Sequence, residues 1–305
     1  MSGVGSAEVA PGPHGGDGLR LARSMGVDPA SILDLSASLN PLAPDVAGLA
    51  VRHVGSLRAY PDAGEARDLL AAAIGVAPEG LLLTNGGAEA IALLGQEIGG
   101  RVEEPEFSLH PRGEGRAPLW RSNPHNPTGL LARPDAVADV WDEAFYPLAT
   151  GAWTRGDIPG GATAVVGSLT KLFACAGLRL GYVLAEPDLI ARLQARQPAW
   201  SVGGLALALM PDLLHGADLV GWANGVAELR LSLTAVLDEY GLHPRPSDAN
   251  FVLCDGPDGF RERLLSHGIV VRDCASFGLP DLVRIAVPAH EGIHRLARAL
   301  DAIRL

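Results

Sequence analysis

The stretch Ala164-Val165-Val166-Gly167-Ser168-Leu169-Thr170-Lys171 continues toward Gly177-Leu178-Arg179-Leu180-Gly181-Tyr182, and these two segments decide the fold. The first is an apolar run typical of a buried strand, and it ends in a turn that carries Ser168 and Lys171. Arg179 follows eight residues after Lys171 and begins a second apolar run. A lysine that is shielded from water or lies near another cation loses its proton more easily and can act as a nucleophile. The pattern therefore predicts a lysine that forms a Schiff base with a phosphorylated aldehyde cofactor, with Ser168 and Arg179 on the phosphate. The alternative is a surface lysine at the end of a strand.

Length, charge and cysteine content limit the classes of function. The 305 residues suffice for one large α/β domain or for two domains that share a cleft. The net charge of −11 disfavours nucleic acid or an anionic membrane as a partner, and no apolar run approaches the ~18 residues needed to span a bilayer. The three cysteines include no Cys-x-x-Cys pair. We therefore expect a cytoplasmic protein with no disulfide and no metal site, in which Met1 to Pro13 form a flexible leader.

The order of predicted strands and helices divides the chain into three parts. Residues 1–40 are expected to form an N-terminal arm and part of a small domain, residues 41–225 a large domain, and residues 226–305 a small α+β domain. Helices are predicted over Gly64 to Ile74, Ala88 to Glu97, Asp135 to Val140 and Val226 to Tyr240.

Two turns carry groups suited to a polar ligand. The apolar strand Leu81 to Thr84 is followed by Asn85-Gly86-Gly87-Ala88, and a strand, a glycine turn and a helix start in this order point free N–H groups and a helix dipole at an anion. The alternative is a tight connection without a ligand. In Asn123-Pro124-His125-Asn126-Pro127-Thr128-Gly129 the two prolines restrict the backbone and would fix the direction of the Asn126 amide.

Three charged residues are expected to need a partner of opposite charge. Asp142 lies among bulky apolar residues, which is costly unless the carboxylate meets a cation or hydrogen-bond donors. A protonated pyridine nitrogen is one such partner, and a nearby arginine or a helix start is the alternative. Arg272 and Arg284 lie at a strand end and within a strand, where a substrate carboxylate or phosphate is a natural partner.

The ordered motifs of the chain resemble those of the fold-type I pyridoxal-phosphate enzymes, the aspartate-aminotransferase superfamily. The resemblance is carried in chain order by Tyr60-Pro61, Asn85-Gly86-Gly87-Ala88-Glu89-Ala90, Asn126-Pro127-Thr128-Gly129, Asp142-Glu143-Ala144-Phe145, Ser168-Leu169-Thr170-Lys171 and Gly177-Leu178-Arg179-Leu180-Gly181-Tyr182. It implies an α/β fold of the aspartate-aminotransferase type. Such a fold has a large domain around a mostly parallel central sheet and a small C-terminal α+β domain.

The resemblance also implies roles for individual residues. Lys171 would form the Schiff base with pyridoxal 5'-phosphate, Asp142 would pair with the pyridinium nitrogen, and Asn126 would bond to the 3-oxygen. The cofactor phosphate would be held by Ser168, Arg179 and the turn Gly86, Gly87 and Ala88, the last of which lacks the hydroxyl often found there. Tyr60 would reach the same phosphate from the neighbouring subunit, which implies a homodimer with shared active sites.

Within the superfamily the chain is similar to the cobalamin-pathway threonine-phosphate decarboxylases and to the histidinol-phosphate aminotransferases. The signs of the decarboxylase are His14-Gly15-Gly16-Asp17, residues 33–42, residues 271–280, and Phe145 where many aminotransferases carry a tyrosine. The resemblance implies a phosphorylated amino-acid substrate. His14 and Arg272 would hold its phosphate, Asn40 would lie close to it, and Arg284 would hold its carboxylate.

The reaction implied in this way is decarboxylation of L-threonine O-3-phosphate to (R)-1-amino-2-propanol O-phosphate. The alternatives are an aminotransferase of the histidinol-phosphate type or one that acts on another amino-acid phosphate and, in a different class, a non-catalytic binding protein that keeps the cofactor fold. Which bond breaks depends on the direction in which the substrate carboxylate is held, and sequence does not show an angle.

Two features depart from the family pattern. The intervals 92–123 and 129–142 are short, so we expect a strand and a helix of the large domain to be missing. The family pattern Pro-x-Phe-x-x-Tyr reads Pro105-Glu106-Phe107-Ser108-Leu109-His110 in this chain. His110 is therefore expected to replace a tyrosine and to stack on the cofactor ring.

Overall fold

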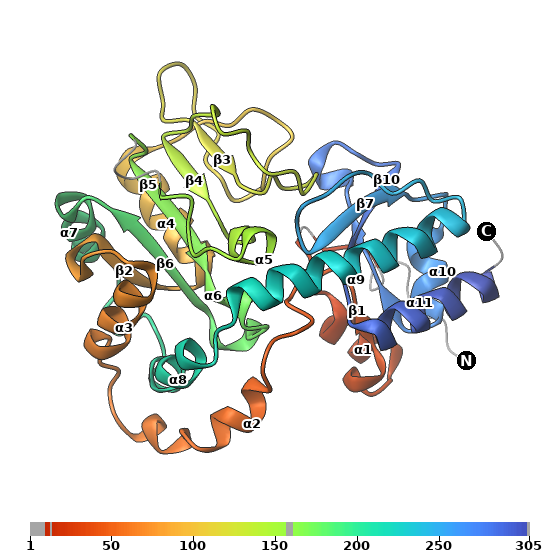
Figure 1. Cartoon of the computed structure of the whole chain (residues 1–305), viewed down its shortest axis with the longest axis horizontal. Helices are drawn as coiled ribbons and strands as arrows, with labels where there is room; N and C mark the ends of the chain where they lie inside the picture. Colours follow the sequence, from red (N-terminus) through yellow and green to blue (C-terminus); the bar gives the residue numbers. More distant parts are fainter. Residues whose placement is uncertain (1–9, 13, 157–160, 304–305) are drawn as a thin grey trace.

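A five-stranded sheet forms the centre of the larger lobe in the computed structural model, which describes residues 10–12, 14–156 and 161–303 (Figure 1). Its strand order is β2 (Leu81–Asn85), β6 (Leu180–Ala185), β5 (Ala164–Ser168), β4 (Val140–Asp142) and β3 (Trp120–Ser122). Strands β3, β4 and β5 are parallel, whereas β6 is antiparallel to both β5 and β2. Only β6 runs against the others, and the expected α/β class with a mostly parallel central sheet is confirmed.

Alternate residues of the buried strands supply two hydrophobic clusters, one on each face of the sheet. Leu81 and Leu83 of β2 pack into one cluster, whereas Leu82 packs into the other. Since successive side chains of a strand point to opposite faces, a strand covered on both sides reads as a continuous apolar run. Helices α3 (Gly64–Ile74) and α8 (Gly204–His215) cover the first face, and α4 (Gly86–Ile98) and α7 (Pro187–Arg196) the second.

The smaller lobe is built on a three-stranded antiparallel sheet. Its order is β7 (Phe251–Asp255), β10 (Leu282–Ala286) and β9 (Arg272–Asp273). Beside it, β1 (Leu33–Asp34) pairs in parallel with β8 (Ile269–Val270), which joins the N-terminal arm to the C-terminal part of the chain. The helices of this lobe are α1 (Gly18–Met25), α10 (Phe260–Ser266) and α11 (His290–Ile303).

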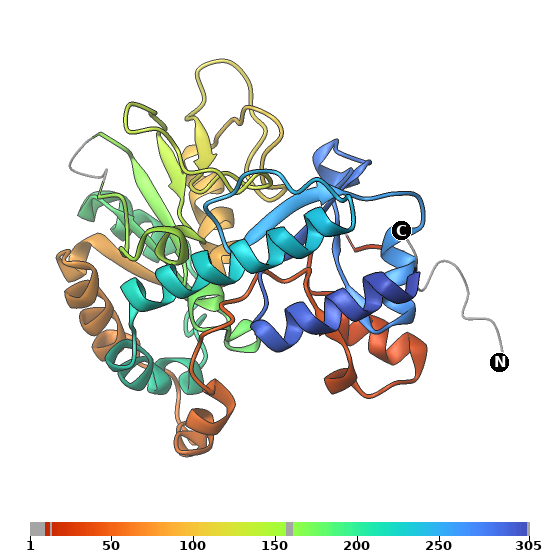
Figure 2. The ribbon, with the colours of Figure 1, turned by 45° about the vertical axis from the view of Figure 1, so that its right-hand side comes forward.

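Helix α9 (Leu219–Glu239) connects the two lobes. It contacts α5 (Tyr146–Thr150) in the large lobe and lies beside α11 in the small lobe (Figure 2). The helix predicted to begin at Val226 therefore begins seven residues earlier, so residue 226 lies inside it. The division of the chain at residues 41 and 226 stays a prediction.

The helix predicted over Asp135 to Val140 is wrong. Residues 134–139 form turns and coil, and Val140 begins β4. The guanidinium of Arg155 explains the difference, because it donates to the carbonyl oxygens of Arg133, Pro134 and Ala136. Those carbonyls would otherwise be the acceptors of the first helical hydrogen bonds.

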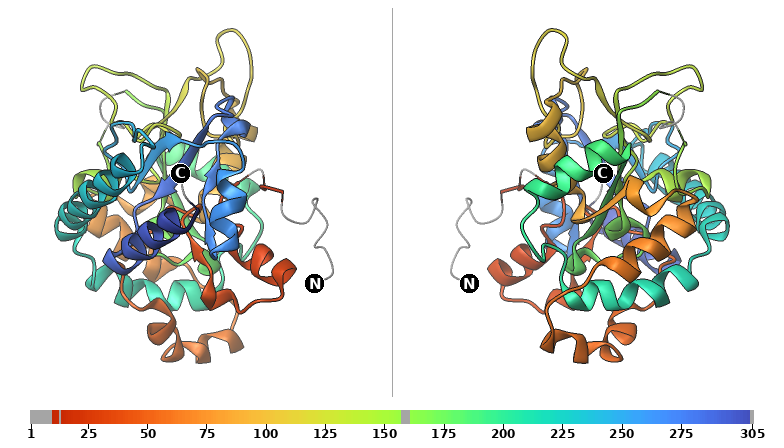
Figure 3. Two further views of the ribbon diagram at one scale, coloured as in Figure 1. Left: turned by 90° about the vertical axis from the view of Figure 1, so that its right-hand side faces the viewer. Right: turned by 90° about the vertical axis from the view of Figure 1, so that its left-hand side faces the viewer.

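The remaining helices are short. They are α2 (Val46–Val51), α6 (Leu169–Leu172) and the 3-10 segments η1 (Pro29–Ser31), η2 (Val54–Arg58), η3 (Pro78–Gly80), η4 (Ala176–Leu178) and η5 (Ala275–Phe277). Helix α2 and η2 lie at the outer edge of the large lobe, away from both sheets (Figures 1 and 3). In the described part of the chain, no helix has the length and apolar character needed to cross a membrane.

Candidate active site

Lys171 lies in α6, directly after the end of β5. Its Nζ donates a hydrogen bond of 2.7 Å to the carbonyl oxygen of Ala37, so the N-terminal arm closes over the amine. The side chain is partly buried, and burial together with the positive charges of Arg284 and Arg179 lowers the pKa of the amine from 10.5 to about 8. A lysine in this state presents a usable fraction of free amine near neutral pH, which a carbonyl-reactive nucleophile requires.

The glycine turn at the start of α4 packs against the guanidinium of Arg179. A methyl group added at Gly86 would lie 2.5 Å from Arg179 Nη2, and Gly86 has a φ of 75°, which an L side chain rarely adopts. A methyl at Gly181 of β6 would lie 2.5 Å from the carbonyl carbon of Gly86. Ser168 also lies here, since its Cβ would be 3.9 Å from a methyl at Gly87. The turn, a hydroxyl and a guanidinium thus converge at one helix N-terminus, which is an arrangement suited to a phosphate.

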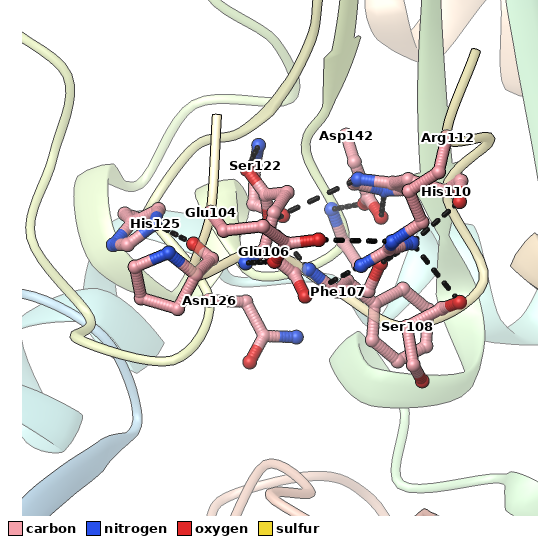
Figure 4. A network of polar contacts seen from close by, with 12 residues as sticks. Glu104, Glu106, Phe107, Ser108, His110, Arg112, Ser122, His125, Asn126 and Asp142 are labelled. Carbon is pink, nitrogen blue, oxygen red and sulfur yellow. Dashed lines mark hydrogen bonds and ion pairs between the residues drawn. The ribbon is translucent and has the colours of Figure 1, made fainter. Parts of the chain in front are cut away.

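Asp142 lies at the end of β4 and is buried. Its Oδ1 accepts a hydrogen bond of 3.0 Å from the backbone N–H of Ala144, and its Oδ2 lies 3.0 Å from Nε2 of His110 (Figure 4). These two contacts fix the plane of the carboxylate, which has free lone pairs for one further donor.

The expectation that His110 stacks on a cofactor ring is wrong. A stacking ring must present one face to the site, but the His110 side chain has an exposed fraction of 0%. It is enclosed by Phe107, whose ring centroid lies 5.6 Å away edge-on, and by Trp120 at 5.5 Å. Phe107 is only partly buried and comes from the same motif, so it is the ring of this loop that is open to a ligand. The sequence signal for Phe107 as the exposed ring was its position in the family pattern Pro-x-Phe-x-x-Tyr.

Arg284 is a buried cation whose side chain is only partly satisfied. Its Nη1 donates to Oδ1 of Asn126 at 2.5 Å, and the guanidinium lies 4.5 Å from the centre of the Phe251 ring. Its Nε is buried without a hydrogen-bond partner, and none of the described carboxylates forms an ion pair with it. Burial lowers the pKa of Arg284 to about 10. A buried guanidinium with a free donor is a candidate site for a ligand carboxylate.

Two aromatic rings in edge-on contact lie beside Lys171 and Arg284. The ring of Phe145 lies 5.7 Å from Lys171 Nζ and packs edge-on against Phe251 at 5.0 Å. Phe251, which sequence reasoning missed, supports both Phe145 and the Arg284 guanidinium.

Arg272 and His14 each contact a serine that lines the same cavity. Arg272 is buried and donates from Nη1 to the carbonyl oxygen of Gly12 and from Nη2 to Oγ of Ser276, each at 2.8 Å. The exposed His14 lies 3.2 Å from Oγ of Ser108 through Nδ1. A cavity of about 380 Å³ is lined by both serines and by Arg112. Burial lowers the pKa of Arg272.

The surroundings of two other predicted site residues, Asn40 and Tyr60, are as follows. Asn40 is buried, and part of its amide is used within the chain, because Nδ2 donates to the carbonyl of Leu172 and Oδ1 accepts from the N–H of Leu42, each at 2.9 Å. The bond to Leu172 holds Asn40 against the Lys171 turn, and the closeness of Asn40 to a substrate stays a prediction. Tyr60 is 79% exposed and its ring lies 4.6 Å from that of Trp200, so it is accessible from outside the chain, and its contact with a neighbouring subunit stays a prediction.

Within the described ranges, no three histidine, cysteine or acidic side chains gather in a way that could hold a metal ion. The residues brought together instead suit an organic anion with a planar ring. They comprise a nucleophilic lysine, a buried acid at a strand end, an anion-binding turn and a buried guanidinium with an unused donor.

The family model and similar curated proteins point to the same family. The family model described as aminotransferase class I and II matches residues 108–303. Histidinol-phosphate aminotransferase 1 of Nitrosococcus oceani is 31% identical over 208 residues, which cover 61% of this chain and 55% of that relative. The histidinol-phosphate aminotransferase of Symbiobacterium thermophilum is 28% identical over 328 positions, covering 89% of this chain and 90% of the relative. An alignment longer than the chain itself means that this relative has segments which the chain lacks.

Solved structures give the same fold. L-threonine-O-3-phosphate decarboxylase from Porphyromonas gingivalis superposes with a TM-score of 0.72 and 25% identity over 88% of this chain and 98% of its own. Histidinol-phosphate aminotransferase from Sinorhizobium meliloti, in complex with pyridoxal-5'-phosphate, superposes with a TM-score of 0.79 and 18% identity over 99% and 98%. The family model spans more than half of the sequence and includes Asn126, Asp142, Lys171 and Arg284. The chain therefore belongs to the class I and II aminotransferase family of pyridoxal-phosphate-dependent enzymes.

Proposed function

We propose that this chain decarboxylates a phosphorylated amino acid, L-threonine O-3-phosphate, and releases CO2 and (R)-1-amino-2-propanol O-phosphate. The observation that carries the proposal is Phe145, which lies 5.7 Å from Lys171 Nζ where many aminotransferases have a tyrosine hydroxyl. The similarity to the Porphyromonas decarboxylase, at 25% identity, adds support. In this chain an apolar ring occupies the position beside the reactive amine.

The residues of the site fit pyridoxal 5'-phosphate. Arg179 and Ser168 flank a glycine turn in which a methyl group at Gly86 would collide with the guanidinium, so the turn is shaped around that cation. Lys171 would attach the aldehyde, Asp142 would accept from the ring nitrogen, and the free Asn126 amide nitrogen would donate to the 3-oxygen. Gly87 and Ala88 would add backbone donors, and Tyr60 would contribute from a second subunit.

When bound, this cofactor withdraws electron density from Cα of the attached amino acid. Arg284 and Asn126 together hold the substrate carboxylate and set its direction, which decides whether CO2 or a proton leaves Cα. Lys171, with its pKa near 8, can return a proton to Cα after CO2 has left. Arg272 and His14 would hold the substrate phosphate at the cavity lined by Ser108 and Ser276.

Transamination is the second candidate, and a specific observation favours it. The curated relatives from Nitrosococcus and Symbiobacterium are named histidinol-phosphate aminotransferases. In that reaction the same lysine would carry the proton between Cα and the cofactor, with the carboxylate held in a different direction.

One experiment separates the two reactions. The purified protein is incubated with L-threonine O-3-phosphate alone, and separately with histidinol phosphate plus 2-oxoglutarate. Release of CO2 without a keto acid supports the decarboxylase, whereas formation of glutamate overturns it in favour of the aminotransferase. Lys171→Ala is the control for background release in both assays.

A separate experiment tests the alternative that this chain is a non-catalytic binding protein. Lys171 is the single lysine of the chain, so borohydride reduction after addition of the cofactor should attach the label to that residue, with the N-terminal amine as the only other amine. Absence of both an absorbance band and a label would reject the two enzymatic proposals together.

We also propose that the active form is a homodimer. Apolar side chains are exposed along α2, η2 and the neighbouring loops: Val51 70%, Val54 53%, Leu57 68%, Tyr60 79% and Trp200 61%. Tyr60 and Trp200 are in ring contact, and several exposed apolar side chains on one segment are typical of an interface. Sedimentation should show that the wild type is a dimer and that Trp200→Lys dissociates into monomers at a higher protein concentration than the wild type does. A wild type that is monomeric at all concentrations would reject the proposal.

A further inference from the structure

Glu106 is a buried carboxylate in the loop between α4 and β3. It is 3% exposed, and its charge is met by three donors. Oε2 accepts from the backbone N–H of Ser122 at 2.8 Å, and Oε1 accepts from Ser122 Oγ at 2.5 Å and from the N–H of Phe107 at 2.8 Å (Figure 4). These three donors hold the Glu106 carboxylate at a fixed place beside Ser122 of β3.

The imidazole of His110 lies between this carboxylate and Asp142. Its Nε2 is 3.0 Å from Asp142 Oδ2, and its Nδ1 is 3.8 Å from Glu106 Oε1. Nδ1 is also buried without any hydrogen-bond partner. If Nδ1 carried no proton, its lone pair would face an anion across a dry gap. A proton on Nδ1 converts that repulsion into an attraction between opposite charges at low dielectric.

The loop that carries both side chains has no helix or strand of its own. Arg112 organises it by donating from Nη1 to the carbonyls of Phe107 and Ser108 at 2.9 and 3.1 Å. Its Nη2 donates to the carbonyl of Glu106 at 3.2 Å. From the other side, His125 Nε2 meets the carbonyl of Pro105 at 2.8 Å. Because the backbone is held at both flanks, the distance between Glu106 and His110 is set by the fold and not by chance rotation of a free loop.

We propose that Glu106 is a positioning residue that keeps a proton on Nδ1 of His110. The imidazolium then holds Asp142 through Nε2, and Asp142 stays an ionised acceptor for the protonated pyridine nitrogen. Glu106 touches neither substrate nor cofactor and acts only through His110. This inference rests on the proposed use of pyridoxal phosphate by the site.

The first test uses the cofactor-free protein and does not depend on activity. Nitrogen NMR of protein labelled with ¹⁵N-histidine at pH 7 reports whether each ring nitrogen carries a proton, and the His110 signal is assigned by its loss in His110→Phe. The wild type is expected to show both nitrogens protonated, and Glu106→Gln only one. Ser122→Ala is the matched control, because it removes one bond to Glu106 but keeps the carboxylate, and it should retain both protons. A neutral His110 ring in the wild type overturns the proposal even if Glu106→Gln does not fold.

The second test measures whether Glu106 acts through His110. Titration of the cofactor-free protein with pyridoxal phosphate should show about tenfold weaker binding for Glu106→Gln, a factor within the coupling range of residues in contact. In the His110→Phe background the same substitution should change the affinity less than about twofold. An equal factor in both backgrounds means that Glu106 only supports the loop, and it overturns the proposal. If the wild type itself fails to bind the cofactor, the proposed function fails, and the NMR result still decides the role of Glu106.

Discussion

The amine of Lys171 makes a direct prediction about stability. Burial and the charges of Arg284 and Arg179 lower its pKa from 10.5 to about 8 in the folded chain. A base with a lowered pKa binds its proton less tightly in the folded state than in the unfolded state. The protonated amine therefore destabilises the fold fully at pH values below 8, and this destabilisation disappears as the pH rises toward 10.5. Replacement by methionine keeps the length of the side chain and removes the charge.

The magnitude follows from the two pKa values. The difference corresponds to about 3 kcal/mol below pH 8 and to about 2 kcal/mol at pH 9. Because the side chain is only partly buried, solvent screening reduces these figures to about 2 and about 1 kcal/mol. Loss of the hydrogen bond to the Ala37 carbonyl offsets about 1 kcal/mol at every pH. Lys171→Met is thus expected to raise the free energy of unfolding by about 1 kcal/mol at pH 7 and by almost nothing at pH 9.

The assay is urea denaturation of the cofactor-free wild type and variant at pH 7, 8 and 9. All other groups titrate in both proteins, so the difference between the two isolates Lys171. Arg133→Met also removes one positive charge, from a side chain that is 82% exposed, and should give a difference that does not change with pH. A Lys171→Met difference that is constant from pH 7 to 9, or that grows with pH, would refute the reasoning.

Three further substitutions test the packing of the site. Gly86→Ala adds a methyl group 2.5 Å from Arg179 Nη2 at a φ of 75°. It should lower the free energy of unfolding in urea by about 1–3 kcal/mol, and an absorbance titration should show weakened cofactor binding. Gly167→Ala drives a methyl group into the buried ring of Tyr182 and should cost about 1–3 kcal/mol by the same urea assay. Arg284→Met removes a buried, partly unsatisfied cation. It should leave the urea stability unchanged or raise it by about 1 kcal/mol, while calorimetry should show at least about tenfold weaker binding of the amino-acid phosphate.

Gly87→Ala is the control for the glycine turn. A methyl group there meets no atom closer than 3.9 Å, so its urea stability should stay close to that of the wild type. If both alanine variants of the turn are equally stable, the contact between Gly86 and Arg179 does not shape the turn. For Arg284, a large loss of stability in the cofactor-free protein would contradict its assignment as an unsatisfied cation.

Much of the large lobe could be predicted from the sequence, because its signals are local. Strands β2, β5 and β6 are buried on both faces, and such strands read as short continuous apolar runs bounded by glycine or a turn. Helix α3 has the expected bounds, and α4 begins at the glycine turn. The same local order of strand, turn and helix placed Lys171 and Gly86 at the ends of their strands.

Other parts could not be predicted, because contacts between distant residues decide them. The segment 134–139 is kept out of a helix by Arg155, whose guanidinium takes the carbonyls that a first turn would use. The Asn40 amide is used by the backbone of Leu172, 132 residues away in the sequence. Neither contact leaves a pattern in the residues around it, so the local preference was the only guide and it was overridden.

The ring of His110 shows how a motif can predict the residues of a site without predicting their direction. The pattern placed two aromatic rings, Phe107 and His110, near the cofactor position, and family resemblance favoured the second as the stacking ring. In a chain segment without secondary structure, tertiary contacts decide which side chain points where. Here a network from Arg112 and from Ser122 on β3 turns His110 inward onto Asp142 and leaves Phe107 partly exposed. The loop between α4 and β3 is short and has no helix of its own. The side chains that hold this loop therefore also decide whether a ligand meets Phe107 or His110.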